Sequence, residues 1–227
     1  MKTRSHTALL VYRAAVALTV AASLALPGAR AVVLYVDCNA PGPTHDGLSW
    51  QTGFLTITEA LSAATTADEI WVADGTYEEA FVLTTDRALY GGFAGTESER
   101  SQRDPAVNVT KIDAGGNRNA FKLNRFTGAG TVIDGFTIQN GDYGITSDEI
   151  VGAITVKGNL FKNQRQVGVS LSGSMNLLGN RFEGIGSTNL SLGGAVIVSG
   201  NEIIGQQYAD GIVCSGAATI TNNTVNG

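Results

Sequence analysis

The chain has 227 residues, including 29 glycines, 2 cysteines and 2 histidines, and its formal net charge is −5. Two cysteines are too few for a disulfide-rich scaffold, and the distant His6 and His45 do not suggest a zinc site. A hydrophobic share of 43% excludes a disordered chain.

Residues 1–31 predict a secretory signal peptide. Met1–Arg13 is basic, Ala14–Leu26 is apolar or small throughout, and Ala29-Arg30-Ala31 offers a cleavage site. The apolar run is shorter than the roughly 20 residues of a transmembrane helix. Four of the 15 basic residues and none of the 20 acidic residues lie in this segment, so the remaining chain carries −9. We therefore expect a secreted protein, extracellular or in the cell envelope, with no membrane span after signal removal. Its acidic surface disfavours nucleic acid as a partner.

Residues 32–68 predict an N-terminal cap. Val32–Val36 has the composition of a strand. Thr56-Ile57-Thr58-Glu59 fits a capping box, and the apolar residues that follow at helical spacing predict a helix over Thr58–Ala67. An amphipathic helix ahead of the first coil would cover the open hydrophobic end of a β-solenoid.

Short strands follow the cap. The apolar runs predict strands over Glu69–Ala73, Ala80–Leu83, Ala88–Gly91, Val109–Ile112 and Ala120–Leu123. The polar and charged stretch Gly95–Asn108 predicts a loop that projects from one coil.

The second half of the chain repeats every 21 to 23 residues. Five similar segments begin at Thr131, Ile154, Met175, Val196 and Ala218, and their apolar residues alternate as in strands. A unit of this length cannot bury its own apolar face, so successive units must stack in register. The sequence therefore predicts an all-β protein: a parallel β-helix domain over residues 32–227, with about seven or eight coils over residues 69–227.

The aligned repeats predict the inward side chains. Three apolar columns are Ile133, Val156, Leu177, Val198 and Ile220; Ile138, Phe161, Phe182, Ile203 and Val225; and Ile145, Val169, Leu190 and Ile212. A polar column consists of Asn159, Asn180, Asn201 and Asn223. Asn tolerates tight bends, and stacked Asn side chains can hydrogen-bond one another, which predicts an inward ladder. Ligand binding by these amides is the alternative interpretation.

The N-terminal residues carry a family resemblance. The ordered motifs are Tyr35-Val36-Asp37, Asp46-Gly47-Leu48-Ser49-Trp50, the segment Asp68–Tyr77 and the segment Leu89–Glu97. They resemble the N-terminal region of a group of secreted bacterial right-handed parallel β-helix repeat proteins with the pectin-lyase-like superfamily fold. The resemblance covers Tyr35–Gly227 and implies a right-handed coil and export. Some members have no assigned activity, whereas others in the superfamily are polysaccharide lyases and hydrolases. Trp50 and Trp71 belong to the motif, and we expect them to pack near the cap.

Two features depart from a complete solenoid. We expect Cys38 and Cys214 to be free, because several coils separate them, or Cys38 to pair between molecules. Thr219–Gly227 is half a repeat, so we expect either a fragment of a longer protein or an end-to-end dimer.

Candidate catalytic residues are few. The resemblance implies that a lyase would need a Lys or Arg base, which removes the proton next to a uronate carboxylate of the substrate, and calcium or basic side chains that neutralise this carboxylate. A hydrolase would need paired carboxylates of its own. Asp142, Arg165 and Asp210 occupy comparable coil positions. A solvated ion pair between Asp142 and Arg165 is the favoured alternative to catalysis. Lys157 and Arg181 are expected in turns, as surface charge.

Candidate ligand-binding residues are Tyr143 and Tyr208, which lie beside Asp142 and Asp210 and could stack on a sugar. We expect a secreted or cell-surface protein that is non-catalytic, with a structural or glycan-binding role. The alternative is a polysaccharide lyase or glycoside hydrolase that acts on extracellular polysaccharide. We expect no cofactor, and calcium only for the lyase.

Overall fold

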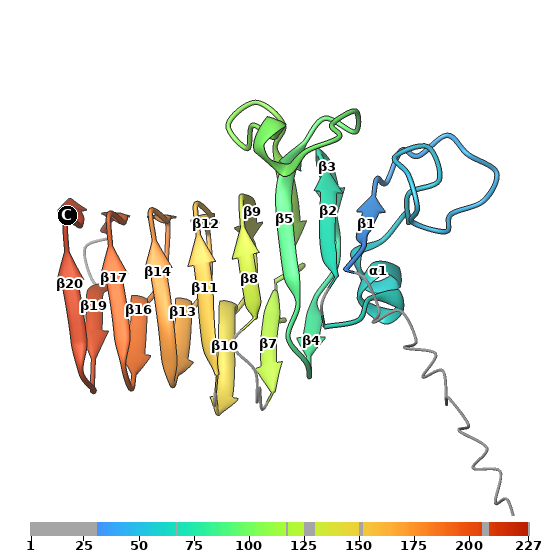
Figure 1. Cartoon of the computed structure of the whole chain (residues 1–227). Coiled ribbons are helices and arrows are strands. Elements are labelled where there is room, and N and C mark those ends of the chain that lie inside the picture. Colours follow the sequence, from blue (N-terminus) through green and yellow to red (C-terminus); the bar gives the residue numbers. More distant parts are fainter. Residues whose placement is uncertain are drawn as a thin grey trace, which may run out of the picture. The chain divides into compact units, whose positions relative to one another are not determined.

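The computed structural model describes residues 31–66, 68–116, 118–124, 130–149, 152–205 and 209–226, so residues 1–30 of the expected signal peptide lie outside the described residues. The described residues form a parallel β-helix with one α-helix at its N-terminal end (Figure 1). No helix among them is long and apolar enough to span a membrane.

Three parallel sheets form the walls of the solenoid. Sheet A contains, in order, β1 (Val33–Val36), β2 (Glu69–Ala73), β5 (Ala88–Phe93), β8 (Thr131–Asp134), β11 (Ala153–Lys157), β14 (Ser174–Leu178), β17 (Val196–Ser199) and β20 (Ala218–Thr221). Sheet B contains β3 (Gly75–Tyr77), β6 (Thr110–Asp113), β9 (Phe136–Gln139), β12 (Leu160–Lys162), β15 (Arg181–Glu183), β18 (Glu202–Ile204) and β21 (Thr224–Asn226). Sheet C contains β4 (Phe81–Leu83), β7 (Phe121–Asn124), β10 (Tyr143–Glu149), β13 (Val167–Ser172), β16 (Thr188–Gly193) and β19 (Asp210–Cys214).

This architecture confirms the predicted fold class. Sheet B supplies one strand per coil, which gives seven coils. The predicted N-terminal strands agree with β1, β2, β4, β6 and β7 to within one residue, and β5 runs two residues further. The sequence missed β3, because its three residues Gly75-Thr76-Tyr77 are too short to show alternation. Right-handedness of the coil stays a prediction.

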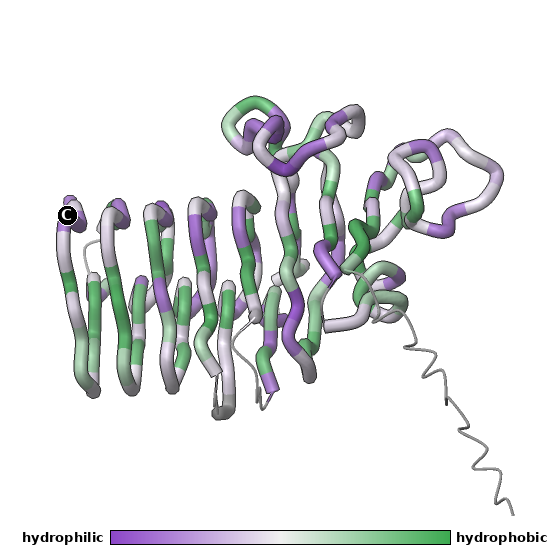
Figure 2. Tube along the Cα trace, in the orientation of Figure 1, coloured by the Kyte–Doolittle hydropathy of each residue, from purple (hydrophilic) through white to green (hydrophobic). Residues whose placement is uncertain are grey.

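The predicted columns fill the interior up to the last described coil, where the prediction was wrong: Ile220 and Val225 are exposed, because no described coil covers them. Val156 and Leu177 are fully buried and pair in register, and the rings of Phe161 and Phe182 stack with centroids 4.8 Å apart. Figure 2 shows these apolar stretches recurring from coil to coil along the strands. Cys38 and Cys214 are free thiols.

The predicted Asn ladder is also present. The amide Nδ2 of Asn159 donates to Oδ1 of Asn180 (3.1 Å), Asn180 donates to Asn201 (3.0 Å) and Asn201 donates to Asn223 (2.9 Å). The residue before each Asn has a positive φ, which only Gly and Asn adopt readily: Gly158, Gly179, Gly200 and Asn222. Turn geometry and side-chain hydrogen bonds therefore explain the column together.

The N-terminal cap contains α1 (Ile57–Ala63), which begins with the predicted capping box between Thr56 and Glu59. The Glu79 carboxylate also accepts hydrogen bonds from the backbone N–H groups of Ile57 (2.9 Å) and Thr58 (3.0 Å). Ile57 and Ala60 are buried, and the helix lies against β1 and β2. These contacts attach the cap to the first coils.

The predicted end of the helix at Ala67 was wrong. The helix ends at Ala63, and Ala64 is its extended C-cap. The Asp68 carboxylate accepts hydrogen bonds from Thr65 N (2.7 Å) and Thr65 Oγ1 (2.8 Å). This local pairing offers the backbone an alternative to another helical turn.

A second apolar cluster lies outside the coil, on the outer face of sheet A. Trp71 and Phe93 stack with ring centroids 4.8 Å apart, and Tyr35 and Trp50 pack at their edges. The indole N–H of Trp50 donates to the carbonyl of Glu97 (2.8 Å). Packing of both tryptophans near the cap is thus confirmed.

Candidate functional site

The predicted projecting loop, Gly95–Asn108, lies against the outer face of sheet A. It contains a short 3₁₀ turn, η1 (Arg100–Gln102). The Arg103 guanidinium donates to the carbonyl of Gly91 (2.9 Å) and to the Asp134 carboxylate (2.6 Å). Side-chain exposure is only 15% for Arg103 and 10% for Asp134, so this ion pair anchors the loop to the sheet.

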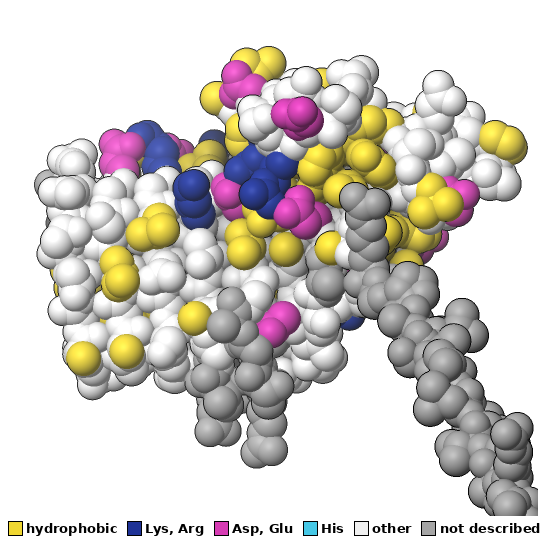
Figure 3. All heavy atoms as spheres, viewed as in Figure 1, with side chains coloured by type: hydrophobic (Ala, Val, Ile, Leu, Met, Phe, Trp, Pro, Cys, Tyr) yellow, Lys and Arg dark blue, Asp and Glu magenta, His cyan; other side chains and the backbone are white. Residues whose placement is uncertain are grey.

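An open hollow of about 790 Å³ lies between this loop and the first strands of sheet A. Its charged lining residues are Glu69, Glu99, Arg100, Arg103, Asp134 and Lys157. Figure 3 shows basic and acidic side chains gathered beneath the projecting loop. We call this feature the charged hollow.

Arg100 lies over Tyr90 on one wall of the charged hollow. Its guanidinium carbon is 4.4 Å from the centroid of the ring, and its Nη1 pairs with Oε1 of Glu69. The other oxygen of Glu69 accepts a hydrogen bond from the indole of Trp71 (2.8 Å). Burial raises the pKa of Tyr90, which keeps the phenol neutral. The wall therefore combines an oriented carboxylate with an aromatic face.

Lys157 lies on another wall of the charged hollow. It is the last residue of β11 and is aligned with Asp134 of β8. The expected place of Lys157 and Arg181 in turns was wrong, because β11 continues through Lys157 and β15 begins at Arg181. The repeats already carried the signal: Asp134 and Lys157 share the fourth position of their repeats, which alternation directs outward.

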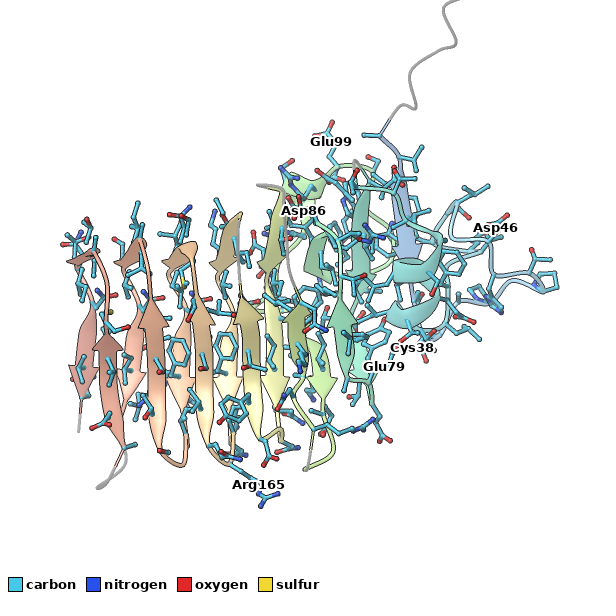
Figure 4. All side chains as sticks on the ribbon, turned by 90° about the horizontal axis from the view of Figure 1, so that it is seen from below. Cys38, Asp46, Glu79, Asp86, Glu99 and Arg165 are labelled. Atoms are coloured by element: carbon cyan, nitrogen blue, oxygen red, sulfur yellow. The ribbon has the colours of Figure 1, made fainter. Side chains whose placement is uncertain are left out.

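The structure brings together two of the three predicted catalytic candidates. Nη1 of Arg165 lies 3.3 Å from Oδ1 of Asp142 and donates to the carbonyl of Gly116 (3.3 Å). Arg165 points away from the solenoid (Figure 4), and its side chain is 59% exposed. Asp210 begins β19, two strand spacings from β13, or about 10 Å. These residues lie along sheet C, whereas the charged hollow lies on sheet A.

The other predicted residues add little to this picture. The Tyr143 hydroxyl donates to Oε1 of Gln166 (3.1 Å), and Tyr208 lies outside the described residues. Asp142 also lines an open hollow of about 460 Å³ together with Arg118 and Lys122. Within the part of the chain that the structure describes, no three His, Cys, Asp or Glu side chains are grouped to hold a metal ion.

A match to a protein-family model identifies the family of the chain. Residues 42–227 match the model of a family described as protein of unknown function (DUF1565). No curated protein and no solved structure matches the chain. Because the match covers most of its length, the chain belongs to the DUF1565 family.

Proposed function

We propose that this protein is an extracellular, non-catalytic β-helix protein that binds a glycan in the charged hollow. The observation that carries the proposal is that the hollow is preformed. Arg103 and Asp134 fix the projecting loop on sheet A, so binding requires little ordering of the protein. The export step rests on the basic, apolar and small-residue pattern of residues 1–31.

The chemistry of the hollow suits a polyhydroxylated ligand. Carboxylates accept hydrogen bonds from sugar hydroxyls, and guanidinium or ammonium groups donate to them. Three acidic and three basic side chains line the hollow, so their formal charges cancel. This balance disfavours a strongly anionic polymer, as does the acidic surface of the whole chain.

The outer face of sheet A offers room for a longer ligand. A second hollow of about 370 Å³ lies over β11, β14, β17 and β20. Its floor is mostly small, with Ala153, Ala195 and Ala217, and Asn176 and Ile197 stand at its side. β11 contributes to both hollows, so an extended glycan could contact successive coils.

Glycan-array screening of the purified protein, followed by calorimetric titration of the best ligand, tests the proposal. Lys157→Ala should weaken binding at least tenfold, because it removes a charged wall of the hollow. Lys162→Ala is the matched control, since Lys162 is also exposed in the same coil but lies in sheet B. Equal affinities of the two variants would exclude the charged hollow as the site. Absence of binding to any glycan would refute the proposal and leave a structural role.

A lyase assay decides between binding and catalysis. The protein is incubated with pectate, alginate and glycosaminoglycans, with and without calcium, and the absorbance of the unsaturated product is followed. We expect no turnover, because the Arg165 guanidinium is already paired with Asp142. Turnover that disappears in Arg165→Ala would make the protein a polysaccharide lyase with Arg165 as the base.

A further inference from the structure

We infer that Glu69 and Tyr90 form a binding site for a positively charged group, and that Arg100 of the projecting loop occupies it as an internal stand-in for the ligand. The inference takes its ligand from the proposed glycan binding: a glycan that carries free, protonated amines. Such an amine would displace the Arg100 side chain and take its place.

The geometry around Arg100 is that of a cation site. Its guanidinium lies over the face of Tyr90 at 4.4 Å, within the range of a cation–π contact, and pairs with the Glu69 carboxylate. The indole N–H of Trp71 holds the second oxygen of Glu69 (2.8 Å). The carboxylate is therefore oriented by the sheet and keeps its position when Arg100 moves.

The charges of the hollow favour an incoming cation once Arg100 withdraws. Three carboxylates then face two basic side chains, so the formal charge of the lining becomes −1. Of these two, Arg103 is paired with Asp134, and its guanidinium carbon lies 5.5 Å from the centroid of the Tyr90 ring, farther than the 4.4 Å of Arg100. Lys157 lies on β11, three strand spacings or about 14 Å from β2, and two residues beyond the position aligned with Glu69. Neither cation neutralises Glu69 directly.

Arg100 is free to exchange, whereas Arg103 is not. The side chains of Arg100 and Glu69 are 45% and 31% exposed, and ion pairs at this exposure contribute little to stability. The part-buried Arg103–Asp134 pair holds the loop on the sheet independently of Arg100. Displacement of Arg100 therefore opens the cation site without detaching the loop.

Two hexasaccharides with the same sugar backbone test the inference: the hexamer of glucosamine, with protonated amines, and the hexamer of N-acetylglucosamine, in which neutral acetamides replace the amines. Binding is followed by calorimetry and by tryptophan fluorescence, because Trp71, which contacts Glu69, is one of only two tryptophans in the chain. Arg100→Ala should bind the glucosamine hexamer at least fivefold more tightly than the wild type does. Adding Glu69→Gln to Arg100→Ala should remove this gain. Arg100→Lys, which keeps a cation in place, should show at most a small gain.

The neutral hexamer should show no gain of affinity in Arg100→Ala, because it carries no amine that could fill the cation site. Equal or weaker binding of the glucosamine hexamer by Arg100→Ala would overturn the inference, because Arg100 would then be a ligand contact or irrelevant. If neither hexamer binds any variant, the choice of an amino-sugar ligand fails, and N-acetylarginine amide is used as the probe. Binding of this guanidinium to Arg100→Ala, and not to Arg100→Ala/Glu69→Gln, would retain the cation site. No binding would overturn the site itself.

Discussion

Replacing Asn180 with Ala tests how much the buried ladder stabilises the solenoid. The Asn180 side chain makes four hydrogen bonds. Its Oδ1 accepts from both N and Nδ2 of Asn159 (3.1 Å each), and its Nδ2 donates to Val156 O (2.9 Å) and Asn201 Oδ1 (3.0 Å). Asn180 is 1% exposed, so water cannot replace these partners without opening the turn.

The expected loss follows from these contacts. A buried hydrogen bond contributes about 0.5–1.5 kcal/mol net, and a buried polar group left without a partner costs about 1–3 kcal/mol. Neighbouring amides can rotate to recover part of this loss. We therefore expect Asn180→Ala to lower the free energy of unfolding by about 2–4 kcal/mol.

Urea unfolding followed by circular dichroism measures the effect, with Asn223→Ala as the control. Asn223 makes three bonds of the same kind, to N and Nδ2 of Asn201 and to Val198 O, but it lies in the last described coil and is partly exposed. Water can replace those bonds, so its loss should stay near 1 kcal/mol or below. Equal losses for the two variants would refute the argument that burial gives the ladder its value.

Three further changes probe packing, capping and charge. A Cβ on Gly168 would lie 2.7 Å from Cδ1 of Phe182, so Gly168→Ala should destabilise by about 1–3 kcal/mol, more than Gly211→Ala, whose Cβ would meet only Cγ1 of Val225 at 3.5 Å; urea midpoints compare the two. Glu79→Ala removes hydrogen bonds to the first turn of α1 and should cost about 1 kcal/mol, seen as faster hydrogen exchange confined to the cap. Burial raises the pKa of the Asp68 carboxyl. Hydrogen bonds from two backbone N–H groups and a hydroxyl lower it, and their combined effect is larger, so the pKa lies below its usual 3.8. The ionised Asp68 carboxylate therefore stabilises the folded state fully above its unfolded-state pKa of 3.8, and this stabilisation is lost as the pH falls through the lower pKa of the folded state. Asp68→Asn has no carboxylate to protonate, so it should lose less stability than the wild type between about pH 5 and pH 3. Equal acid sensitivity of the two proteins would contradict this assignment.

The interior of the coils could be predicted because each repeat has the same pattern of inward-facing residues. Val156 and Leu177 stand at the same repeat position, and parallel pairing then places one above the other. The reason for many glycines could not be predicted in the same way. Gly144 and Gly168 lie within strands, where a Cβ would come within 2.6–2.7 Å of the rings of Phe161 and Phe182. Their role depends on packing between walls, which the one-dimensional pattern does not record.

The charged hollow could be predicted only in part. Repeat alignment places Asp134 and Lys157 side by side on the outer face. Arg100 and Arg103 come from a loop that no repeat shares, and Glu69 belongs to a strand outside the aligned segments. Single contacts, such as that between Arg103 and Asp134, determine where the non-repeating loop lies against the sheet. Such contacts leave no periodic signal in the sequence.

The Asn ladder also has a polarity. The backbone N–H of Phe136 donates to Oδ1 of Asn159, and every Oδ1 of the ladder accepts from the preceding coil. The Nδ2 groups of Asn159, Asn180 and Asn201 each donate to the Oδ1 of the following coil as well as to a backbone carbonyl of the preceding one. The side-chain amide dipoles therefore add along the solenoid axis, with their positive ends toward the C-terminal coils. Chains of aligned amides polarise one another, by an estimated 10–30% per bond. Each coil that joins the stack thus strengthens the bonds of the coils before it, and the ladder behaves as one electrostatic unit.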